Sequence, residues 1–333
     1  MAEFEGPSGL VLQVQRMSTE DGPGLRSTAF LKGCPLECAW CHNPESIAAR
    51  PEVQWIRLRC IGCGRCLAAC GAGALARSAD GAVLIRRGDC SGCGACAEAC
   101  PSGAMELSGE RRAAAALAAE LLKDASYFKR SDRGGVTLSG GEASAQPAFA
   151  REVLRLCAEG GTHTALDTCG CASWESLSSL YPYTRLLLWD LKEIDGAKHE
   201  EFTGLGNELV LENLIRTAEY MRERASPEAI WVRTPVIPGA TDTEANLYGL
   251  GLALGRLAPP RLERWELLAF NNLCADKYKR LGLDWAYAAS PLMTRLEMER
   301  LAAAARRGLA AAGGVDASIV SWTGSTRLEP ERN

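Results

Sequence analysis

The chain has 333 residues, of which 47% are hydrophobic and 23% are charged, and its net charge is −4 at pH 7. This is the composition of an ordinary globular protein that can bury a large core in one large domain or in two. The charge gives no electrostatic reason to expect binding to nucleic acid or to an anionic membrane, and no apolar run approaches a membrane span. Residues 1–9 lack the basic-then-apolar pattern of a signal peptide, so we expect a cytoplasmic protein.

Cysteine is unusually frequent, with 15 residues. A disulfide scaffold is typical of short secreted chains, and this chain is neither short nor expected to be secreted, so metal ligation is the better interpretation. Eleven of the cysteines fall between Cys34 and Cys100. The other four are scattered, and buried inert thiols are the default for them: Cys157, Cys169, Cys171 and Cys274.

A first strand is expected over Gly9–Arg16, followed by a loop with the sequence STEDGPGLRST. The next stretch, KGCPLECAWCHNPE, places Cys34, Cys38 and Cys41 at the spacing C-x3-C-x2-C. Three thiolates on a tight loop can hold three irons of a [4Fe–4S] cluster, which leaves the fourth iron open to a substrate. A zinc knuckle with His42 as fourth ligand is the alternative. Zinc knuckles usually present C-x2-C pairs, so the spacing favours the cluster.

The segment from about residue 53 to residue 107 holds two copies of the pattern C-x2-C-x2-C-x3-C. This is the bacterial ferredoxin run, in which the fourth cysteine of each run binds the cluster of the other run. The expected ligands of the two clusters are Cys60, Cys63, Cys66 and Cys100 for one, and Cys90, Cys93, Cys96 and Cys70 for the other. Zinc is a minor alternative here. The motif indicates electron transfer but does not indicate which reaction.

After Leu107 the sequence alternates between strand and helix patterns. Strands are expected over Gly135–Leu138, Thr164–Thr168, Arg185–Leu191, Ile230–Val236, Trp265–Leu268 and Ala317–Trp322. Helices are expected over Arg111–Lys123, Pro147–Glu159, Trp174–Leu180, Leu211–Arg224, Thr243–Leu257 and Leu296–Ala312. This alternation predicts a parallel sheet, open or barrel-like, with the functional site at the carboxyl ends of its strands.

Small and charged residues stand where these strands are expected to end: Asp21, Gly140, Gly141, Glu142, Asp167, Thr168, Asp190 and Lys192. An open iron needs a chelating ligand, and the amine and carboxylate of an amino acid would serve. Lys192 could balance that carboxylate, while the backbone and carboxyl groups of Gly140–Glu142 could accept hydrogen bonds from the amine. With two further clusters to pass electrons, reduction of a ligand bound at iron points to radical chemistry.

At this point the residues match a family. The matching stretches are TEDGPGLRST, KGCPLECAWCHNPE, the two ferredoxin runs, GGVTLSGGEASAQ, LDTCG, LLLWDLKEID, EFTGLGNELVLEN and RTPVIPGATD. They resemble the radical S-adenosylmethionine enzymes, and more closely the activating enzymes of glycyl radical enzymes, which are relatives of pyruvate formate-lyase activase. The resemblance implies an α/β fold, a partial (β/α)6 barrel, with an inserted ferredoxin-like domain that binds two clusters. The implied domains are residues 1–52, the insert 53–107, and residues 108–333.

The implied reaction is reductive cleavage of S-adenosylmethionine to methionine and a 5′-deoxyadenosyl radical. That radical takes a hydrogen from a backbone glycine of a partner glycyl radical enzyme. The implied cofactors are three [4Fe–4S] clusters, S-adenosylmethionine and a monovalent cation. A flavodoxin or ferredoxin would donate electrons, and the protein would be a monomer. Two other functions remain open: a radical enzyme that modifies a small molecule, and an electron carrier without an activity of its own.

Carried over by position, Cys34, Cys38 and Cys41 hold the active cluster, and S-adenosylmethionine chelates its open iron. The other implied ligand contacts are Trp40 at the cluster or adenine, Gly140, Gly141 and Glu142 at the methionyl amine, Asp167, Thr168 and Lys192 at the ribose and methionyl end, and Asn246 after PGATD. The implied cation site consists of Asp21, Asp167, Thr168 and Asp190. The chain departs from the family in the glycine motif, which runs GGEAS where many members have GGEP.

Overall fold

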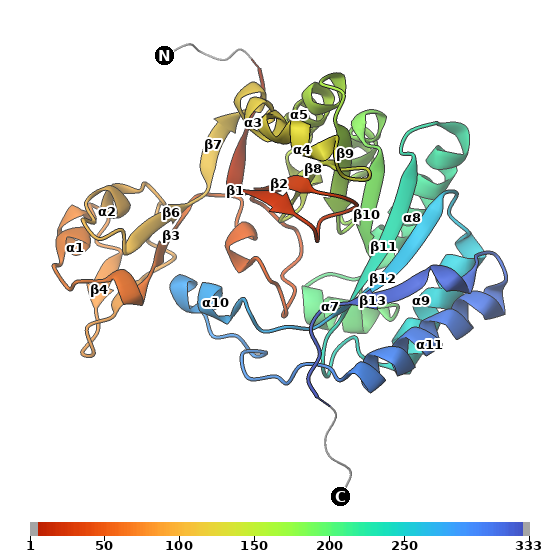
Figure 1. Ribbon diagram of the computed structural model, residues 1–333. Coiled ribbons are helices and arrows are strands. Elements are labelled where there is room, and N and C mark those ends of the chain that lie inside the picture. Colours follow the sequence, from red (N-terminus) through yellow and green to blue (C-terminus); the bar gives the residue numbers. More distant parts are fainter. Residues whose placement is uncertain (1–5, 329–333) are drawn as a thin grey trace, which may run out of the picture.

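A nine-stranded sheet forms the body of the protein in a computed structural model that describes residues 6–328 (Figure 1). The strand order is β13-β12-β11-β10-β9-β8-β2-β1-β7. These strands are β1 (Ser8–Ser18), β2 (Arg26–Leu31), β7 (Glu110–Ala113), β8 (Gly135–Gly140), β9 (His163–Thr168), β10 (Leu186–Asp190), β11 (Ala229–Val236), β12 (Leu262–Ala269) and β13 (Val320–Thr323).

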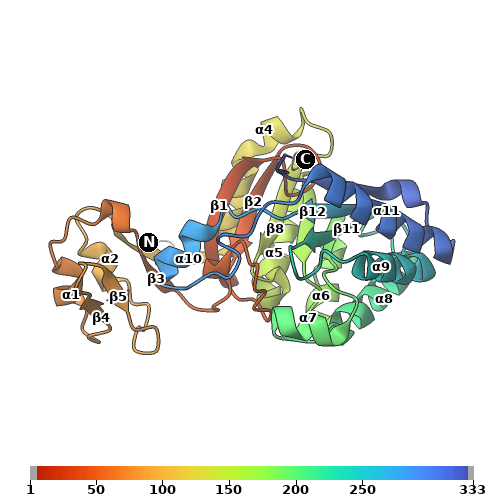
Figure 2. The same cartoon turned by 90° about the horizontal axis from the view of Figure 1, so that it is seen from below.

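From β13 to β2, each strand of this order lies parallel to its neighbour, which confirms the expected α/β class with a mostly parallel sheet. The helices outside the insert are α3 (Ala114–Leu121), α4 (Ala125–Phe128), α5 (Pro147–Glu159), α6 (Trp174–Ser178), α7 (Gly196–Thr203), α8 (Glu208–Glu223), α9 (Glu244–Leu257), α10 (Ala275–Leu281) and α11 (Arg295–Ala312). Figure 2 shows α8, α9 and α11 on one side of the sheet and α10 on the other.

Two strands depart from the parallel pattern, because β1 runs antiparallel to both β2 and β7 at one edge of the sheet. Chain connectivity explains this arrangement: a loop of only seven residues, 19–25, joins β1 to β2, and a parallel pair needs a longer crossover. The helix expected from Arg111 begins instead at Ala114, because residues 110–113 pair with β1. The strand expected over Ala317–Trp322 begins with a 3₁₀ turn, Ala317–Ile319.

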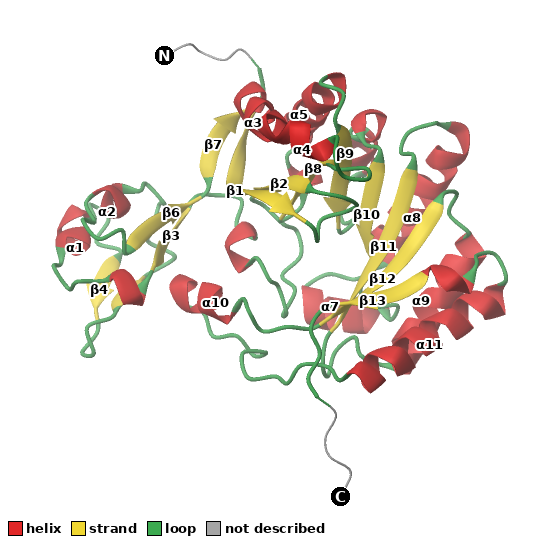
Figure 3. Cartoon of the chain, in the orientation of Figure 1, coloured by secondary structure: helices red, strands yellow, loops and turns green. Residues whose placement is uncertain are grey.

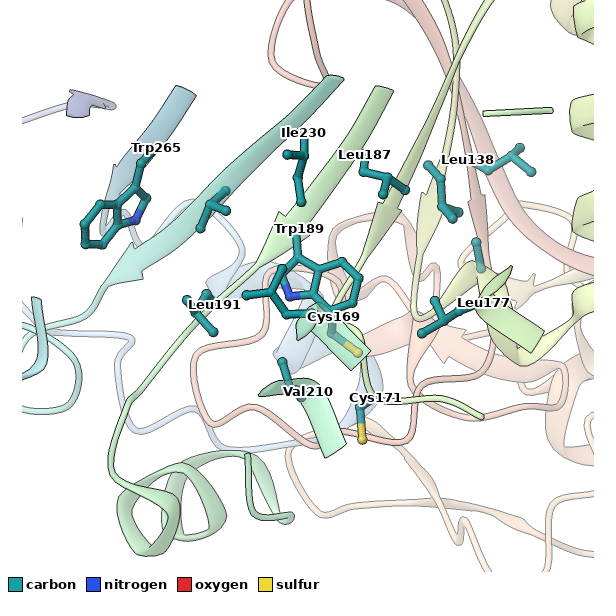
Figure 4. Close-up of a cluster of buried hydrophobic side chains, with 14 of the residues drawn as sticks. Leu138, Cys169, Cys171, Leu177, Leu187, Trp189, Leu191, Val210, Ile230 and Trp265 are labelled. Carbon is teal, nitrogen blue, oxygen red and sulfur yellow. The ribbon is translucent and has the colours of Figure 1, made fainter. Parts of the chain in front are cut away.

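The main hydrophobic core lies between the sheet and its covering helices (Figure 4). Side chains alternate along each strand, so Leu187 and Trp189 of β10 face this core while Leu186 and Leu188 face the opposite side. Trp189 is fully buried and lies against the loop after β9. A Cβ at Gly170 would come within 2.3 Å of the Trp189 ring, so the packing requires glycine there.

The insert is a small separate lobe beside the sheet, as Figures 1 and 2 agree. Its first and last strands, β3 (Glu52–Trp55) and β6 (Met105–Ser108), pair antiparallel and close its base. Its other elements are α1 (Arg65–Ala69), β4 (Leu75–Arg77), β5 (Val83–Ile85) and α2 (Ala95–Glu98). Loops make up most of this lobe (Figure 3), and the two runs of cysteines lie mainly in them. The expected division at residues 53 and 107 stays a prediction.

Among the described residues, no helix has the length and apolar character needed to cross a membrane. The sequence patterns did not predict α7 or α10, and both pack against the loop that carries Cys34, Cys38 and Cys41. The helices have only eight and seven residues, so neither shows a strong helical periodicity in the sequence.

Candidate functional site

The polar side chains at the strand ends come together because they occupy the same face of neighbouring parallel strands. Residues 137 and 139 of β8, 165 and 167 of β9, 188 and 190 of β10, and 231 and 233 of β11 alternate with core residues. In the register, Asp190 lies opposite Arg233 and Leu188 lies opposite Asp167. The ends of these strands therefore present Ser139, Asp167, Asp190 and Arg233 side by side on the face away from the core.

A cavity of about 470 Å³ lies at these strand ends, a volume in the range of small-molecule sites. Most of the predicted site residues line it: Asp21, Cys34, Cys38, Trp40, Cys41, Gly140, Gly141, Asp167, Thr168, Asp190 and Lys192. They come from the loop after β1, the cysteine loop after β2 and the ends of β8, β9 and β10. The sequence-based prediction thus names one connected site.

Glu142 and Asn246 do not line this cavity. The Glu142 carboxylate is fully buried and accepts hydrogen bonds from the Ser144 amide and hydroxyl, the Thr168 hydroxyl and the Cys169 amide. The Asn246 side chain accepts from the Ile194 amide and donates to the carbonyls of Lys192 and Thr241. Both side chains bond to neighbouring loops instead of facing the cavity, so the structure does not place them where they were predicted to contact a ligand.

An ion network occupies the floor of the cavity. The Arg233 guanidinium pairs with Asp167 and, at 3.1 Å, with Asp190, while Lys192 Nζ lies 2.7 Å from Asp190. Burial raises the pKa of Asp167 to about 6 despite the nearby guanidinium. Burial acts on Asp190 in the same direction, but Lys192 and Arg233 outweigh it and leave the pKa of Asp190 below its ordinary value. Two cations thus face two carboxylates before any ligand binds.

Close approach of two backbone segments requires glycine at both Gly140 and Gly141. Gly140 has φ of +121°, and a Cβ there would lie 2.1 Å from the Leu31 amide nitrogen. A Cβ at Gly141 would lie 2.4 Å from the carbonyl oxygen of Gly33. The two glycines therefore let the end of β8 approach the start of the cysteine loop, and the Gly141 and Glu142 amides donate to carbonyls of Leu31 and Gly33.

The cysteine loop is held from two sides. The amides of Glu37 and Ala39 donate to the carbonyls of Thr203 and Phe202 at the end of α7. On the other side, the Trp285 indole donates to the Ala39 carbonyl at 2.9 Å, and the Tyr278 hydroxyl of α10 donates to the Cys41 carbonyl at 2.9 Å. These bonds fix the backbone that positions the three thiols.

Trp40 points from the cysteine loop into a small apolar cluster rather than into solvent. It is 5% exposed and packs in a cluster with Ile237 and Phe270. The Phe202 ring of α7 lies 5.9 Å from it. Trp40 also lines the cavity with the three thiols, and its contact with a cluster or an adenine stays a prediction.

The three thiols fit a cluster that binds through cysteine. Cys34, Cys38 and Cys41 all line the one cavity. Burial raises the pKa of Cys38 to about 11 and raises that of Cys41 further, so iron would have to supply the positive charge that ionises them. Within residues 6–328, no three His, Cys, Asp or Glu side chains are placed to hold a single metal ion. A cubane bonds one cysteine to each iron, which sets its ligands farther apart than the ligands of one ion.

The insert also brings its cysteines together in two groups, across the two runs. Cys70 of the first run shares a small cavity of about 100 Å³ with Cys90, Cys93 and Cys96 of the second. In the other group, burial raises the pKa of Cys66, and the charges of Cys100 and Cys60 add to this effect. The amide nitrogens of Ala74 and Ala104 lie 3.3 and 3.2 Å from the sulfurs of Cys70 and Cys100. The fourth cysteine of each run therefore lies near cysteines of the other run, which is the arrangement that the predicted ligand sets require.

Several residues of the site were missed from the sequence. Arg233 lies in β11 and lines the cavity. An arginine inside an otherwise apolar strand is unusual, and this could have indicated a functional role. Ser139 donates to the Asp167 carboxylate at 2.5 Å. Cys169, treated as an inert thiol, lines the cavity and hydrogen-bonds Cys34, which lowers the pKa of Cys34. Nothing in the sequence pattern brings Cys169 to Cys34, because the contact depends on how β9 ends.

Comparisons with known proteins agree with this geometry. Residues 85–250 match the model of the radical SAM superfamily, residues 59–104 that of the 4Fe-4S dicluster domain, and residues 20–63 that of a 4Fe-4S single cluster domain. The chain is 40% identical over 298 residues to the (2S)-3-sulfopropanediol sulfolyase activating enzyme of Bilophila wadsworthia, covering 87% of this chain and 96% of that protein.

Two further relatives carry related names. The isethionate sulfite-lyase activating enzyme of Nitratidesulfovibrio vulgaris is 38% identical over 83% of this chain and 89% of its own length. The choline trimethylamine-lyase activating enzyme of Oleidesulfovibrio alaskensis is 35% identical over 90% of this chain and 95% of its own length. These relatives match nearly the whole chain, insert included. The chain belongs to the radical SAM activating enzymes of glycyl radical enzymes, in the form with an inserted 4Fe–4S dicluster domain.

Proposed function

We propose that this activating enzyme binds S-adenosylmethionine in the cavity at the strand ends and directs the 5′-deoxyadenosyl radical at a backbone glycine of its partner. The observation that best supports this is the convergence of the three thiols of the cysteine loop and the ion network of Asp167, Asp190, Lys192 and Arg233 on one cavity of about 470 Å³. Cys34, Cys38 and Cys41 would hold a [4Fe–4S] cluster, which would supply an iron open to S-adenosylmethionine and the electron for its reductive cleavage.

The residues of this chain bind and orient the ligand. Lys192 and Arg233 bring two positive charges to the cavity, and Asp190 contacts both. A ligand carboxylate that enters beside Lys192 is favoured by that charge, because the site is buried and water does not screen it. The Asp167 carboxylate is held by Ser139 and Arg233 and can accept a hydrogen bond from a ribose hydroxyl. Trp40 covers the apolar side of the cavity.

The cation predicted beside Asp21, Asp167, Thr168 and Asp190 remains a proposal. Asp21 already accepts hydrogen bonds from the hydroxyls of Ser18 and Thr28, at 2.6 and 2.7 Å. Arg233 supplies positive charge between the other two carboxylates. Because no three carboxylates of the described residues are placed around one point, the proposed monovalent cation would contact at most two of Asp21, Asp167 and Asp190 and would balance the negative charge that Arg233 and Lys192 leave.

The proposed cofactor count is three cubanes, with a flavodoxin or ferredoxin as electron donor. We expect about twelve irons per chain after anaerobic reconstitution, because each cubane contributes four. Iron assay together with inorganic sulfide measures this. Replacing Cys60 and Cys63 by alanine should lower the count to about eight, while a wild-type count near four would remove both clusters of the insert.

The thiols also bear on where the enzyme works. Eleven cysteines must remain reduced to bind iron, which a disulfide-forming compartment would prevent, so we propose a cytoplasmic enzyme. We also propose that it is a monomer. Size-exclusion chromatography with light scattering tests the monomer under anaerobic conditions.

The decisive experiment mixes the reduced, reconstituted protein with S-adenosylmethionine and a candidate partner under anaerobic conditions. Suitable partners are glycyl radical enzymes of the kinds that the relatives are named for, which act on isethionate, sulfopropanediol or choline. We expect a doublet EPR signal from the glycyl radical on one of them. A modified small molecule, with no such signal on any partner, would favour the alternative radical enzyme instead.

A further inference from the structure

The two cysteine groups of the insert differ in how they face the rest of the molecule. The loop that carries Cys60 and Cys63 lies at an open surface, where Leu58 is 97% exposed and Ile61 is 68% exposed. A Cβ at Gly62 would have Arg77 as its only neighbour within 4 Å. Two such apolar side chains on one short loop are unusual on a free surface, because they gain from being covered.

The loop of the second group is packed against the body of the protein instead. A Cβ at Gly92 would lie 2.3 Å from the Pro51 carbonyl oxygen, which shows how closely the two backbones approach. Arg50, just before the insert, donates to the Cys90 carbonyl at 2.7 Å. Arg87, three residues before Cys90, donates to the Leu281 carbonyl at the end of α10 at 2.6 Å.

Helix α10 also contacts the cysteine loop, which carries Cys34, Cys38 and Cys41. Leu281 ends the helix, and Tyr278, one turn earlier, donates to the carbonyl of Cys41. Figures 1 and 2 both show α10 between the insert and the sheet. The order in space is therefore the Cys60 group, with the exposed Leu58 and Ile61 beside it, then the Cys90 group, then α10 and the cysteine loop.

The exposed end is also basic in a chain whose net charge is −4. Four exposed arginines surround it: Arg57, Arg59, Arg65 and Arg77. Arg57 pairs with Asp80 and Arg59 with Glu106. Arg65 and Arg77 have no ion-pair partner among the described residues. Cys93 of the second group is exposed as well, but the apolar residues and the unpaired arginines lie at the Cys60 end.

We propose that the surface formed by Leu58, Ile61, Arg65 and Arg77 is the docking surface for an acidic protein that carries single electrons. An apolar centre with a basic rim matches a small acidic carrier in charge. Each docking event moves one electron: the reduced carrier is oxidised by one electron, the centre held by the Cys60 group is reduced by one, and no bond or proton is exchanged. The inference rests on the proposed function, because it names the entry point for the electron that the catalytic centre consumes.

The test is a charge-reversed surface in the reconstituted enzyme, Leu58→Glu combined with Arg65→Glu. Both side chains are exposed, and neither residue is one of the cysteines proposed to bind a cluster. The matched control is Ile215→Glu with Lys129→Glu, which makes the same change in charge on the body of the protein, where Ile215 of α8 is 47% exposed. The probe is a recombinant acidic flavodoxin, and binding is measured by isothermal titration calorimetry at two salt concentrations.

We expect the variant to bind flavodoxin at least about tenfold more weakly, the control to bind as the wild type does, and salt to weaken wild-type binding. Stopped-flow reduction of the clusters by flavodoxin should slow by a similar factor. Equal binding by variant and wild type, or no binding by the wild type, overturns the proposal. So does a variant that binds flavodoxin normally but loses the glycyl radical enzyme, since that assigns the surface to the protein substrate.

Chemical reduction separates this inference from the proposed function. With dithionite in place of flavodoxin, the variant should cleave S-adenosylmethionine at the wild-type rate, because the catalytic cavity is unchanged. If the wild type itself fails to cleave under dithionite, the proposed function is wrong, while the binding comparison still decides the docking surface.

Discussion

Replacing Cys38 by alanine is expected to abolish cleavage of S-adenosylmethionine, and this is the largest single effect that the structure implies. Cys38 lines the cavity with Cys34 and Cys41, and the loop holds no fourth cysteine to take its place. A cubane with only two protein ligands is not held on the loop, so neither the open iron nor the electron reaches the ligand. Anaerobic assays of 5′-deoxyadenosine by liquid chromatography measure the loss, and the iron count should fall from about twelve to about eight.

The matched control for this experiment is Cys157→Ala. Cys157 is fully buried on α5, away from the cavity, and burial raises the pKa of its thiol to about 12. Its loss should cost on the order of 1 kcal/mol of stability and leave both cleavage and iron content unchanged. Cleavage that persists in Cys38→Ala would sink the assignment of the catalytic cysteines.

The α/β body was predictable because its strands are buried on both faces or alternate clearly. The pattern over Arg185–Leu191 predicted β10, and the pattern over Pro147–Glu159 predicted α5 with the same bounds. The antiparallel edge was not predictable, because the four residues of β7 adjoin an alanine-rich helix whose pattern dominates the window. The short helix α10 was missed for a different reason: its packing against the cysteine loop, rather than its own periodicity, explains it.

The cavity was predictable to the extent that its residues stand next to strand ends in the sequence. Asp167, Asp190 and Lys192 line it as expected. Glu142 also follows a strand end, and Asn246 lies in the first turn of α9, but both side chains turn inward to satisfy backbone groups of neighbouring loops. Only the three-dimensional structure decides whether a buried polar residue serves a ligand or a loop, because both uses satisfy its hydrogen bonds equally well.

The second large effect is expected from Arg233→Met, which removes the guanidinium between Asp167 and Asp190. All three side chains are largely buried, with 11%, 14% and 23% of their side-chain surface exposed. Breaking a buried ion pair from one side typically destabilises a protein by about 3–5 kcal/mol, because a charge remains without a partner. Anaerobic urea unfolding of the reconstituted protein measures this cost. The exposed pair of Arg185 and Glu228 is the matched control, and Arg185→Met should cost less than about 1 kcal/mol.

The loss should also depend on pH, in a direction that the buried carboxyl determines. The pKa of Asp167 is already raised to about 6 with Arg233 present, and it rises further without the guanidinium. A folded state whose carboxyl has a raised pKa binds more protons than the unfolded state, so its stability falls as pH rises from about 4 through the raised value. Arg233→Met should therefore be more destabilised at pH 8 than at pH 5, and adding Asp167→Asn should recover part of the loss at pH 8. If Arg233→Met alone were as stable as the wild type at pH 8, Lys192 alone would neutralise both carboxylates and the predicted role of Arg233 would be wrong.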